Sequence, residues 1–198
     1  MLYCFVVLVF FIAFRKHSYF KIFSRFSILI WTDWGENKIE YARLDGSNRQ
    51  DLVKENVGYP NGVSYDFASG RVYWCDAKTD KIEFVDLLPN ANGVRARGEV
   101  PIVKGGIVHP FGITVFNNYI YWSDWGKRAI LRTDTNGTEI TVMRSPHLSL
   151  MGLRVYNKGR QTGNLYFFNL YFFRIICCCC CCCCCCCFFF KFYYFYQN

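Results

Sequence analysis

Short runs of apolar and aromatic residues, each closed by an aspartate, recur along the middle of the chain. Three such runs, residues 29–33, 72–76 and 120–124, carry a tryptophan two positions before the aspartate. Apolar runs of this length with aromatic residues predict strands, and the Gly, Asn and Asp residues that follow them are typical of turns. The tryptophan–aspartate pairs are Trp31 and Asp33, Trp74 and Asp76, and Trp122 and Asp124.

The spacing of these runs is that of a repeated unit. Trp74 lies 43 residues after Trp31, and Trp122 lies 48 residues after Trp74. A four-stranded blade of a β-propeller takes about 40–45 residues, so the second interval predicts a blade with a small insertion. We place that insertion in an exposed loop within residues 89–105, because loops tolerate extra length.

A glycine precedes the second and third tryptophans in short apolar segments. Gly62 lies in residues 60–63, Gly112 lies in residues 110–113, and Gly152 lies in a third copy at residues 150–153. A strand glycine often marks a place where another backbone approaches closely. We therefore predict that these segments form the inner strands of the blades, which crowd around the propeller axis.

Two stretches carry a resemblance to a known family. Residues 73–83 and 109–116 resemble class B repeats of the low-density lipoprotein receptor family, the tyrosine-tryptophan-threonine-aspartate type. The chain is most similar to the giant endocytic low-density lipoprotein receptor-related proteins, with the Wnt co-receptor branch second. The resemblance implies an all-β fold: about three four-stranded blades of an incomplete six-bladed β-propeller. A closed ring needs about 250 residues. The likeness covers only residues 27–163, so we expect the ring not to close within this chain.

Composition divides the chain into three segments. Residues 27–163 form the partial propeller, with blades near 27–58, 59–108 and 109–163. Residues 1–26 are apolar and then basic, so a signal peptide, a membrane anchor and non-native coding sequence all remain open. Residues 164–198 are aromatic and contain an unbroken run of cysteines. Metal sites and disulfides both need separated cysteines, so we assign this low-complexity tail no function. Because only about three of six blades are found, we expect the chain to be a fragment of a larger receptor.

The net charge of +8 belongs to the flanks. All 15 acidic residues lie between Asp33 and Glu139, and a similar number of basic residues balances them there. The predicted blades therefore present no basic stripe, and no nucleic-acid motif is found. Outside the cysteine run only Cys4 and Cys75 remain, which predicts no disulfide framework within the blades.

The repeated aspartates are not predicted to be catalytic. General acid–base chemistry needs two carboxyl groups in one cleft, whereas equivalent blade positions spread Asp33, Asp76 and Asp124 around an axis. We expect each to accept backbone N–H bonds, and each tryptophan to pack between blades. Cys75 has no evident histidine partner that would make it a nucleophile. We predict no catalytic residue, no metal and no cofactor, and a propeller enzyme is the least favoured alternative.

His109 is the main candidate for a functional side chain, and an ordinary surface histidine at the start of a strand is the alternative. The resemblance matches it to a histidine that takes part in acid-dependent ligand release, although the partner histidine of the family would fall at Asp80. Histidine changes charge between pH 5 and 8. His17 and His147 lie outside the matched pattern.

Three turn residues complete the candidate surface: Trp34, Glu36 and Trp125. The co-receptor branch uses aromatic and acidic residues of such turns to bind peptides, and core packing is the alternative for each. Asn136 begins an Asn-Gly-Thr sequence in a predicted turn, which is a glycosylation acceptor pattern.

The resemblance predicts the function of an extracellular receptor fragment without catalytic activity. It would bind protein or lipoprotein ligands for endocytosis or co-receptor signalling, and the full-length protein would be a single-pass plasma-membrane receptor with epidermal-growth-factor-like modules. Membrane attachment would come from parts outside this chain. The alternative is a secreted matrix-binding propeller similar to nidogen.

Overall fold

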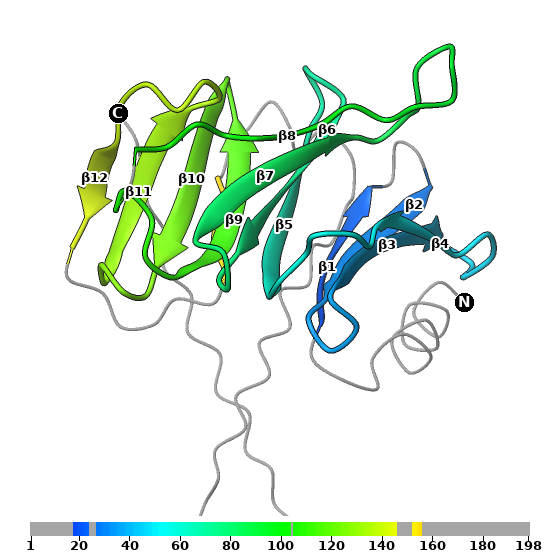
Figure 1. Ribbon diagram of the computed structural model, residues 1–198, viewed down its shortest axis with the longest axis horizontal. Coiled ribbons are helices and arrows are strands. Elements are labelled where there is room, and N and C mark those ends of the chain that lie inside the picture. Colours follow the sequence, from blue (N-terminus) through cyan, green and yellow to red (C-terminus); the bar gives the residue numbers. More distant parts are fainter. Residues whose placement is uncertain (1–17, 24–26, 104, 146–151, 156–198) are drawn as a thin grey trace, which may run out of the picture. The chain divides into compact units, whose positions relative to one another are not determined.

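The computed structural model describes residues 18–23, 27–103, 105–145 and 152–155. Within them, every regular element is a strand, and the strands form three four-stranded antiparallel sheets (Figure 1). The all-β prediction with three four-stranded blades is confirmed. These strands lie in the first of two compact units, which ends at Arg154. No helix long and apolar enough to cross a membrane occurs in the part of the chain that the structure describes.

Each sheet is a simple meander in which strands that follow one another in sequence pair antiparallel. The first sheet consists of β1 (Ser18–Phe23), β2 (Ile28–Asp33), β3 (Lys38–Arg43) and β4 (Gln50–Val53). The second consists of β5 (Pro60–Asp66), β6 (Arg71–Asp76), β7 (Lys81–Asp86) and β8 (Arg97–Glu99). The third consists of β9 (Pro110–Phe116), β10 (Tyr119–Asp124), β11 (Ala129–Asp134) and β12 (Thr141–Arg144).

The first sheet begins earlier than the sequence indicated. β1 pairs with β2 over its full length, with Ser18 opposite Asp33 and Phe23 opposite Ile28. The predicted boundary at residue 26 therefore does not coincide with the edge of the sheet, because this strand lies in the apolar and basic N-terminal segment. The other segment boundaries stay predictions. Residues 152–155 carry no strand assignment, so the place of Gly152 on a fourth inner strand also stays a prediction.

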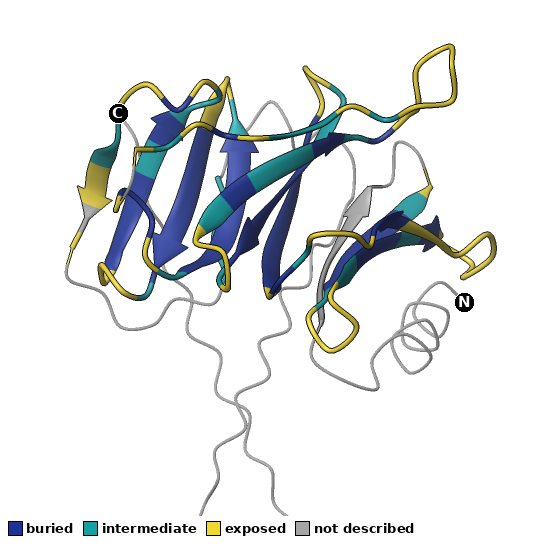
Figure 2. Cartoon of the chain, in the orientation of Figure 1, coloured by how far each residue is buried: buried dark blue, intermediate teal, exposed yellow. Residues whose placement is uncertain are grey.

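The middle sheet shows how the blades pack. Successive residues of a strand point to opposite faces, and β6 uses both faces: Val72 and Trp74 join a buried cluster with the first sheet, whereas Tyr73 and Cys75 join one with the third. Figure 2 shows that the central strands are buried along most of their length. The chain thus stacks one sheet face on the next, as in a propeller.

The inner strands β5 and β9 lie in contact. A Cβ atom on Gly62 would lie 2.6 Å from the carbonyl oxygen of Phe111. Only glycine permits this approach, so the structure shows at Gly62 the close backbone contact that the sequence predicted.

Candidate functional site

Three interactions between the sheets align their inner ends. The Thr32 hydroxyl donates to the carbonyl oxygen of Asn61, and the Asn61 side-chain amide donates to the carbonyl oxygen of Pro110. The Ser64 hydroxyl accepts the N–H of Val115. β2, β6 and β10 each end in an aspartate, and these three strand ends lie at the same end of the stacked sheets. We call it the aspartate end, and it consists of the turns 34–37, 77–80 and 125–128. The opposite, hairpin end consists of the turns 44–49, 67–70, 87–96, 117–118 and 135–140.

The aspartate end is held together by the repeated carboxylates. Asp76 accepts N–H bonds from Gly58 at 2.6 Å and Tyr59 at 3.0 Å, and others from Lys78 and Thr79. It thereby joins the turn after β6 to the segment that enters β5. Because both carboxylate oxygens accept backbone N–H bonds, the role of Asp76 is structural: it holds two backbone segments together, and we call such an aspartate a clamp.

Asp124 repeats the arrangement in the third blade. Its carboxylate accepts N–H bonds from Val108 at 2.9 Å, His109 at 3.1 Å and Lys127 at 2.9 Å. Asp33 accepts the N–H groups of Gly35 and Glu36 in its own turn. The backbones that carry the candidate binding residues are thus fixed by charged acceptors, which form stronger hydrogen bonds than neutral ones.

Cys75 lies beside two of these clamps and is fully buried. Burial raises the pKa of its thiol well above the ordinary value, and the charges of Asp124 and Asp76 act in the same direction. The thiolate is the nucleophilic form of cysteine, so this environment opposes reactivity. Within the described residues, no group of three or more His, Cys, Asp or Glu side chains could hold a metal ion.

Three rings form a stack at the aspartate end of the third blade. The indole of Trp125 lies 4.0 Å from the ring of Phe111 at an interplanar angle of 5°. The imidazole of His109 lies 5.6 Å from the indole at 24°. Phe111 is buried, whereas His109 and Trp125 are half-buried. A buried phenyl ring therefore supports an indole and an imidazole that both reach solvent.

Further aromatic side chains lie at the same end of the other blades. Trp34 is 39% exposed and Tyr59 is 48% exposed. The ammonium group of Lys78 lies 5.5 Å from the ring centre of Tyr59, which is cation–π range. Glu36 is exposed in the turn that holds Trp34. The structure thus brings His109 and Trp125 together and places Trp34 and Glu36 in the equivalent turn of the first blade.

Sequence reasoning missed Tyr59 and Phe111. Tyr59 precedes the predicted inner strand, and Phe111 was assigned to the strand motif alone. A signal was available, because Tyr59 directly precedes the glycine-containing segment 60–63 and Phe111 lies within the segment 110–113. His17 and His147 lie outside the described residues.

The residues opposite the three tryptophans mark a second constellation that the sequence analysis did not find. We call these positions the outer rim: Glu40 opposite Trp31, Glu83 opposite Trp74 and Leu131 opposite Trp122. The Trp31 indole donates to Glu40 Oε2 at 3.0 Å, and Arg49 donates to both Glu40 oxygens at 2.8 Å. In the second blade, Arg97 donates to Glu83 Oε1 at 2.8 Å and lies 5.4 Å from the ring centre of Trp74. A glutamate nine residues after the tryptophan was the available signal.

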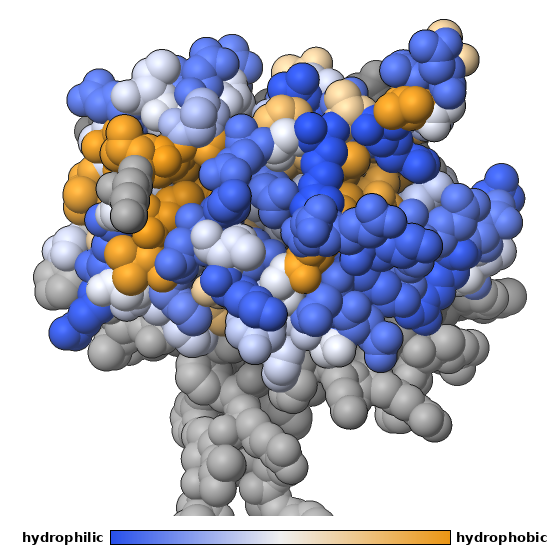
Figure 3. Space-filling view, in the orientation of Figure 1, coloured by the Kyte–Doolittle hydropathy of each residue, from blue (hydrophilic) through white to orange (hydrophobic). Residues whose placement is uncertain are grey.

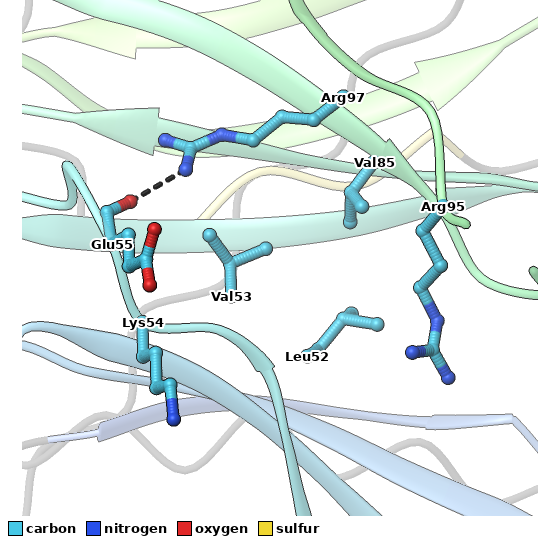
Figure 4. Close-up of a pocket in the computed structure, with 7 residues that line it drawn as sticks. All are labelled: Leu52, Val53, Lys54, Glu55, Val85, Arg95 and Arg97. Atoms are coloured by element: carbon cyan, nitrogen blue, oxygen red, sulfur yellow. Dashed lines mark hydrogen bonds between the residues drawn. The ribbon is translucent and has the colours of Figure 1, made fainter. Parts of the chain in front are cut away.

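A hollow of about 250 Å³ lies at this rim, between the first two sheets (Figure 4). Its lining consists of Leu52, Val53, Lys54, Glu55, Val85, Arg95 and Arg97. Arg97 donates to the backbone carbonyls of Glu55 and Asn56, and Arg95 donates to the Leu87 carbonyl and the Tyr41 hydroxyl. These arginines join the sheets, so the hollow is a seam between blades and a weaker candidate than the aromatic stack.

Comparisons with known proteins agree with this architecture. The family model for the low-density lipoprotein receptor repeat class B matches residues 29–63. The chain is similar to the vitellogenin receptor Yl of Drosophila melanogaster, at 36% identity over 104 residues, or 52% of this chain and 5% of that protein. It is also similar to the low-density lipoprotein receptor-related protein 5-like protein of Homo sapiens, at 34% identity over 134 residues, or 67% of this chain and 50% of that protein.

A solved structure gives the same picture of the fold. The nidogen–laminin complex matches with a TM-score of 0.55 and 28% identity, covering 69% of this chain and 49% of the matched chain. The chain therefore spans half or less of the length of each of these proteins.

Proposed function

This chain belongs to the low-density lipoprotein receptor family, and we propose that it forms part of a ligand-binding propeller in the extracellular portion of a receptor. The proposal assigns it no catalysis and no cofactor. The complete receptor would be a single-pass plasma-membrane protein with epidermal-growth-factor-like modules. Its function would be the uptake of protein or lipoprotein ligands, or co-receptor signalling.

The stack of Phe111, Trp125 and His109 is the observation that carries this proposal. Tryptophan is enriched among the residues that dominate binding energy at interfaces. Rings that are ordered before binding lose little conformational freedom on association. Here the Asp124 clamp holds the backbone of His109 and the turn of Trp125. The aspartate end thus offers a rigid aromatic surface, to which we add Trp34 and Glu36 from the first blade.

His109 gives this surface a route to acid-dependent release. An imidazole that gains a proton between pH 5 and 8 changes the charge of any contact it makes. In the described structure the groups around it are the Trp125 ring, the Asp124 carboxylate that accepts its backbone N–H, and the nearby Lys127 turn. Asp80 occupies the position of the family's partner histidine, so in this proposal His109 acts without one.

The likeness to nidogen supports a second candidate function, a secreted matrix-binding propeller. The two candidates differ in ligand and use the same scaffold. The vitellogenin receptor relative makes vitellogenin the probe for the first candidate, and the nidogen–laminin complex makes laminin the probe for the second.

The test is binding to a receptor ectodomain that contains this chain. We expect vitellogenin to bind at neutral pH. Trp125→Ala should weaken binding at least about tenfold, a loss of about 1.4 kcal/mol, because tryptophan is enriched among the residues that dominate binding energy. Phe67→Ala is the matched control: Phe67 is an exposed aromatic at the hairpin end, and its loss should change affinity less than about twofold.

The pH arm uses His109→Gln, which should bind at neutral pH and fail to release near pH 5.5, in the acidic part of the range where histidine titrates. Unchanged affinity of Trp125→Ala would contradict the proposed surface. Binding of laminin without vitellogenin would favour the matrix candidate.

A further inference from the structure

Asn136 lies in the turn between β11 and β12, which one carboxylate orders. Asp134 Oδ1 accepts the N–H of Asn136 at 3.2 Å and of Thr138 at 2.9 Å, and Oδ2 accepts the Thr138 hydroxyl at 2.8 Å. Asn136 and Thr138 are both exposed. The turn therefore presents the asparagine side chain to solvent from a defined backbone.

Gly137, the middle residue of the acceptor sequence, is fixed by its surroundings. Its φ angle is 71°, a conformation that favours glycine. A Cβ atom at this position would lie 2.7 Å from the carbonyl oxygen of Pro101. Gly137 therefore packs against the connection that enters the third blade, whereas Asn136 and Thr138 on either side of it are exposed to solvent.

The turn also lies at the opposite end of the blade from the aromatic stack. β11 runs from Ala129, next to the turn of Trp125, to Asp134, next to the turn of Asn136. Five residue steps along a strand span about 17 Å. A large group on Asn136 would therefore project from the hairpin end and leave the aspartate end uncovered.

We propose that Asn136 carries an N-linked glycan that lies outside the ligand-binding surface. A lipid-linked oligosaccharyl diphosphate is the donor: a bond forms between the Asn136 amide nitrogen and the anomeric carbon, the amide loses one proton, and the lipid diphosphate leaves. Asn136 is the only asparagine of the chain followed by Ser or Thr two positions later. The proposal rests on the proposed function for entry into the secretory pathway and for the location of the binding surface.

The test expresses the full chain behind an added secretory leader in animal cells, so that entry into the pathway does not depend on the chain's own N-terminus. Total cell and secreted material is digested with an amidase specific for N-glycans in ¹⁸O-water, and the peptides are mapped by mass. The heavy-oxygen label distinguishes a released glycan from deamidation of the Asn-Gly pair before the digestion, and a parallel digest without the amidase measures deamidation during it. We expect label at residue 136, its loss in Asn136→Gln and Thr138→Ala, and its retention in Thr138→Ser.

Ala77→Asn is the matched positive control, because it creates Asn-Lys-Thr in the aspartate-end turn of the second blade. Absence of a glycan at Asn136 overturns the modification, and it does so independently of ligand binding. Binding is then measured in ectodomains that carry the same changes, with vitellogenin as the probe. We expect Asn136→Gln to leave affinity within about twofold and a glycan at residue 77 to lower it at least about tenfold. Weakened binding in Asn136→Gln would overturn the placement of the glycan outside the binding surface.

Discussion

The second and third blades place a tryptophan in the same register opposite different residues. Trp74 lies opposite Glu83, and Trp122 lies opposite Leu131. Both indole rings are fully buried, and among the described residues the Nε1 atom of each has no hydrogen-bond partner. The shared tryptophan therefore fills volume between blades, and the chemistry of the rim is decided by what faces it.

The connections that precede the two blades explain the difference. The connection from β4 to β5 covers residues 54–59, and two of its carbonyls accept hydrogen bonds from Arg97, which also pairs with Glu83. The connection from β8 to β9 is longer, residues 100–109, and its Ile102 and Ile107 pack into the buried cluster of the third blade. In the second blade the short connection accepts hydrogen bonds from the arginine that pairs with Glu83. In the third blade two isoleucines of the longer connection pack beside Trp122 and Leu131.

The outer strands follow the same division. Lys81 pairs with Glu99 in the second blade, and the equivalent positions of the third blade are Ala129 and Val142. Figure 3 shows apolar residues gathered over the third sheet, where Val142 is 59% exposed. The two blades thus share strands and register, and they differ in whether charged or apolar side chains, together with the preceding connection, surround the tryptophan.

Putting a charge into the apolar rim should give the largest effect. Leu131→Glu places a carboxylate in the buried cluster that holds Ile102, Ile107 and Trp122, whose described members are all apolar or aromatic apart from Cys75. An unpaired buried charge costs about 3–5 kcal/mol, so the free energy of unfolding in urea should fall by that amount. Leu131→Met keeps the volume and should cost less than about 1.5 kcal/mol; equal losses in the two variants would refute the apolar-rim account.

The reverse exchange, carried out in the first blade, should cost less. Glu40 is 2% exposed and accepts bonds from Trp31 and Arg49, so Glu40→Leu leaves the indole N–H unpaired. Lost hydrogen bonds to a charged group are worth about 1.5–3 kcal/mol, and urea unfolding should show a decrease of that size. Glu36→Leu, an exposed position of the same blade, should stay within about 0.5 kcal/mol and serves as the reference.

The two rim glutamates should respond to pH in opposite directions. Burial alone would raise the pKa of Glu40, but hydrogen bonds from Arg49 and Lys38 outweigh it and lower the pKa from 4.5. Glu40 therefore stabilises the fold above pH 4.5, and this contribution is lost as the pH falls through the folded pKa. Burial raises the pKa of Glu83 above 4.5 against the opposing bond from Arg97.

For Glu83 the folded state holds the proton more tightly than the unfolded chain. Its stabilising contribution is therefore complete below pH 4.5 and is lost as the pH rises through the folded pKa. Unfolding curves from about pH 3 to 7 should show that Glu40→Gln removes a rise in stability with pH, whereas Glu83→Gln removes a fall. The same sign of change in both variants would contradict this assignment.

The exposed ion pair of the second blade should matter least. The side chains of Lys81 and Glu99 are 44% and 45% exposed, and pairs of this kind contribute about 0–1 kcal/mol. Lys81→Ala should lower the free energy of unfolding by no more than about 1 kcal/mol. A larger loss would show that the charged rim, and not the connection, determines the stability of this blade.

The sequence predicted the features that depend on local pattern. The strands around Trp31, Trp74 and Trp122 follow from apolar runs closed by turns, and Gly62 follows from the need for close backbone approach. β1 was missed, because it lies in the apolar and basic N-terminal segment. The sequence therefore predicted the blades and left the N-terminal edge of the first one undetermined.

The candidate site was predicted in part for a similar reason. His109 and Trp125 were recognised individually, but their contact depends on the Asp124 clamp, which joins segments 15 residues apart. Arg97 was missed because it follows Glu83 by 14 residues, whereas Arg49 follows Glu40 by nine. The longer loop between β7 and β8 hides this correspondence, and only the folded register reveals it.

A hydrogen-exchange footprint of the ectodomain with its bound probe protein tests the central claim most directly. The claim is that this scaffold binds its ligand through the aspartate end. It predicts slower amide exchange in residues 34–37, 77–80 and 125–128 on binding, and unchanged exchange in residues 44–49 and 135–140. Protection confined to those hairpin-end turns would contradict it.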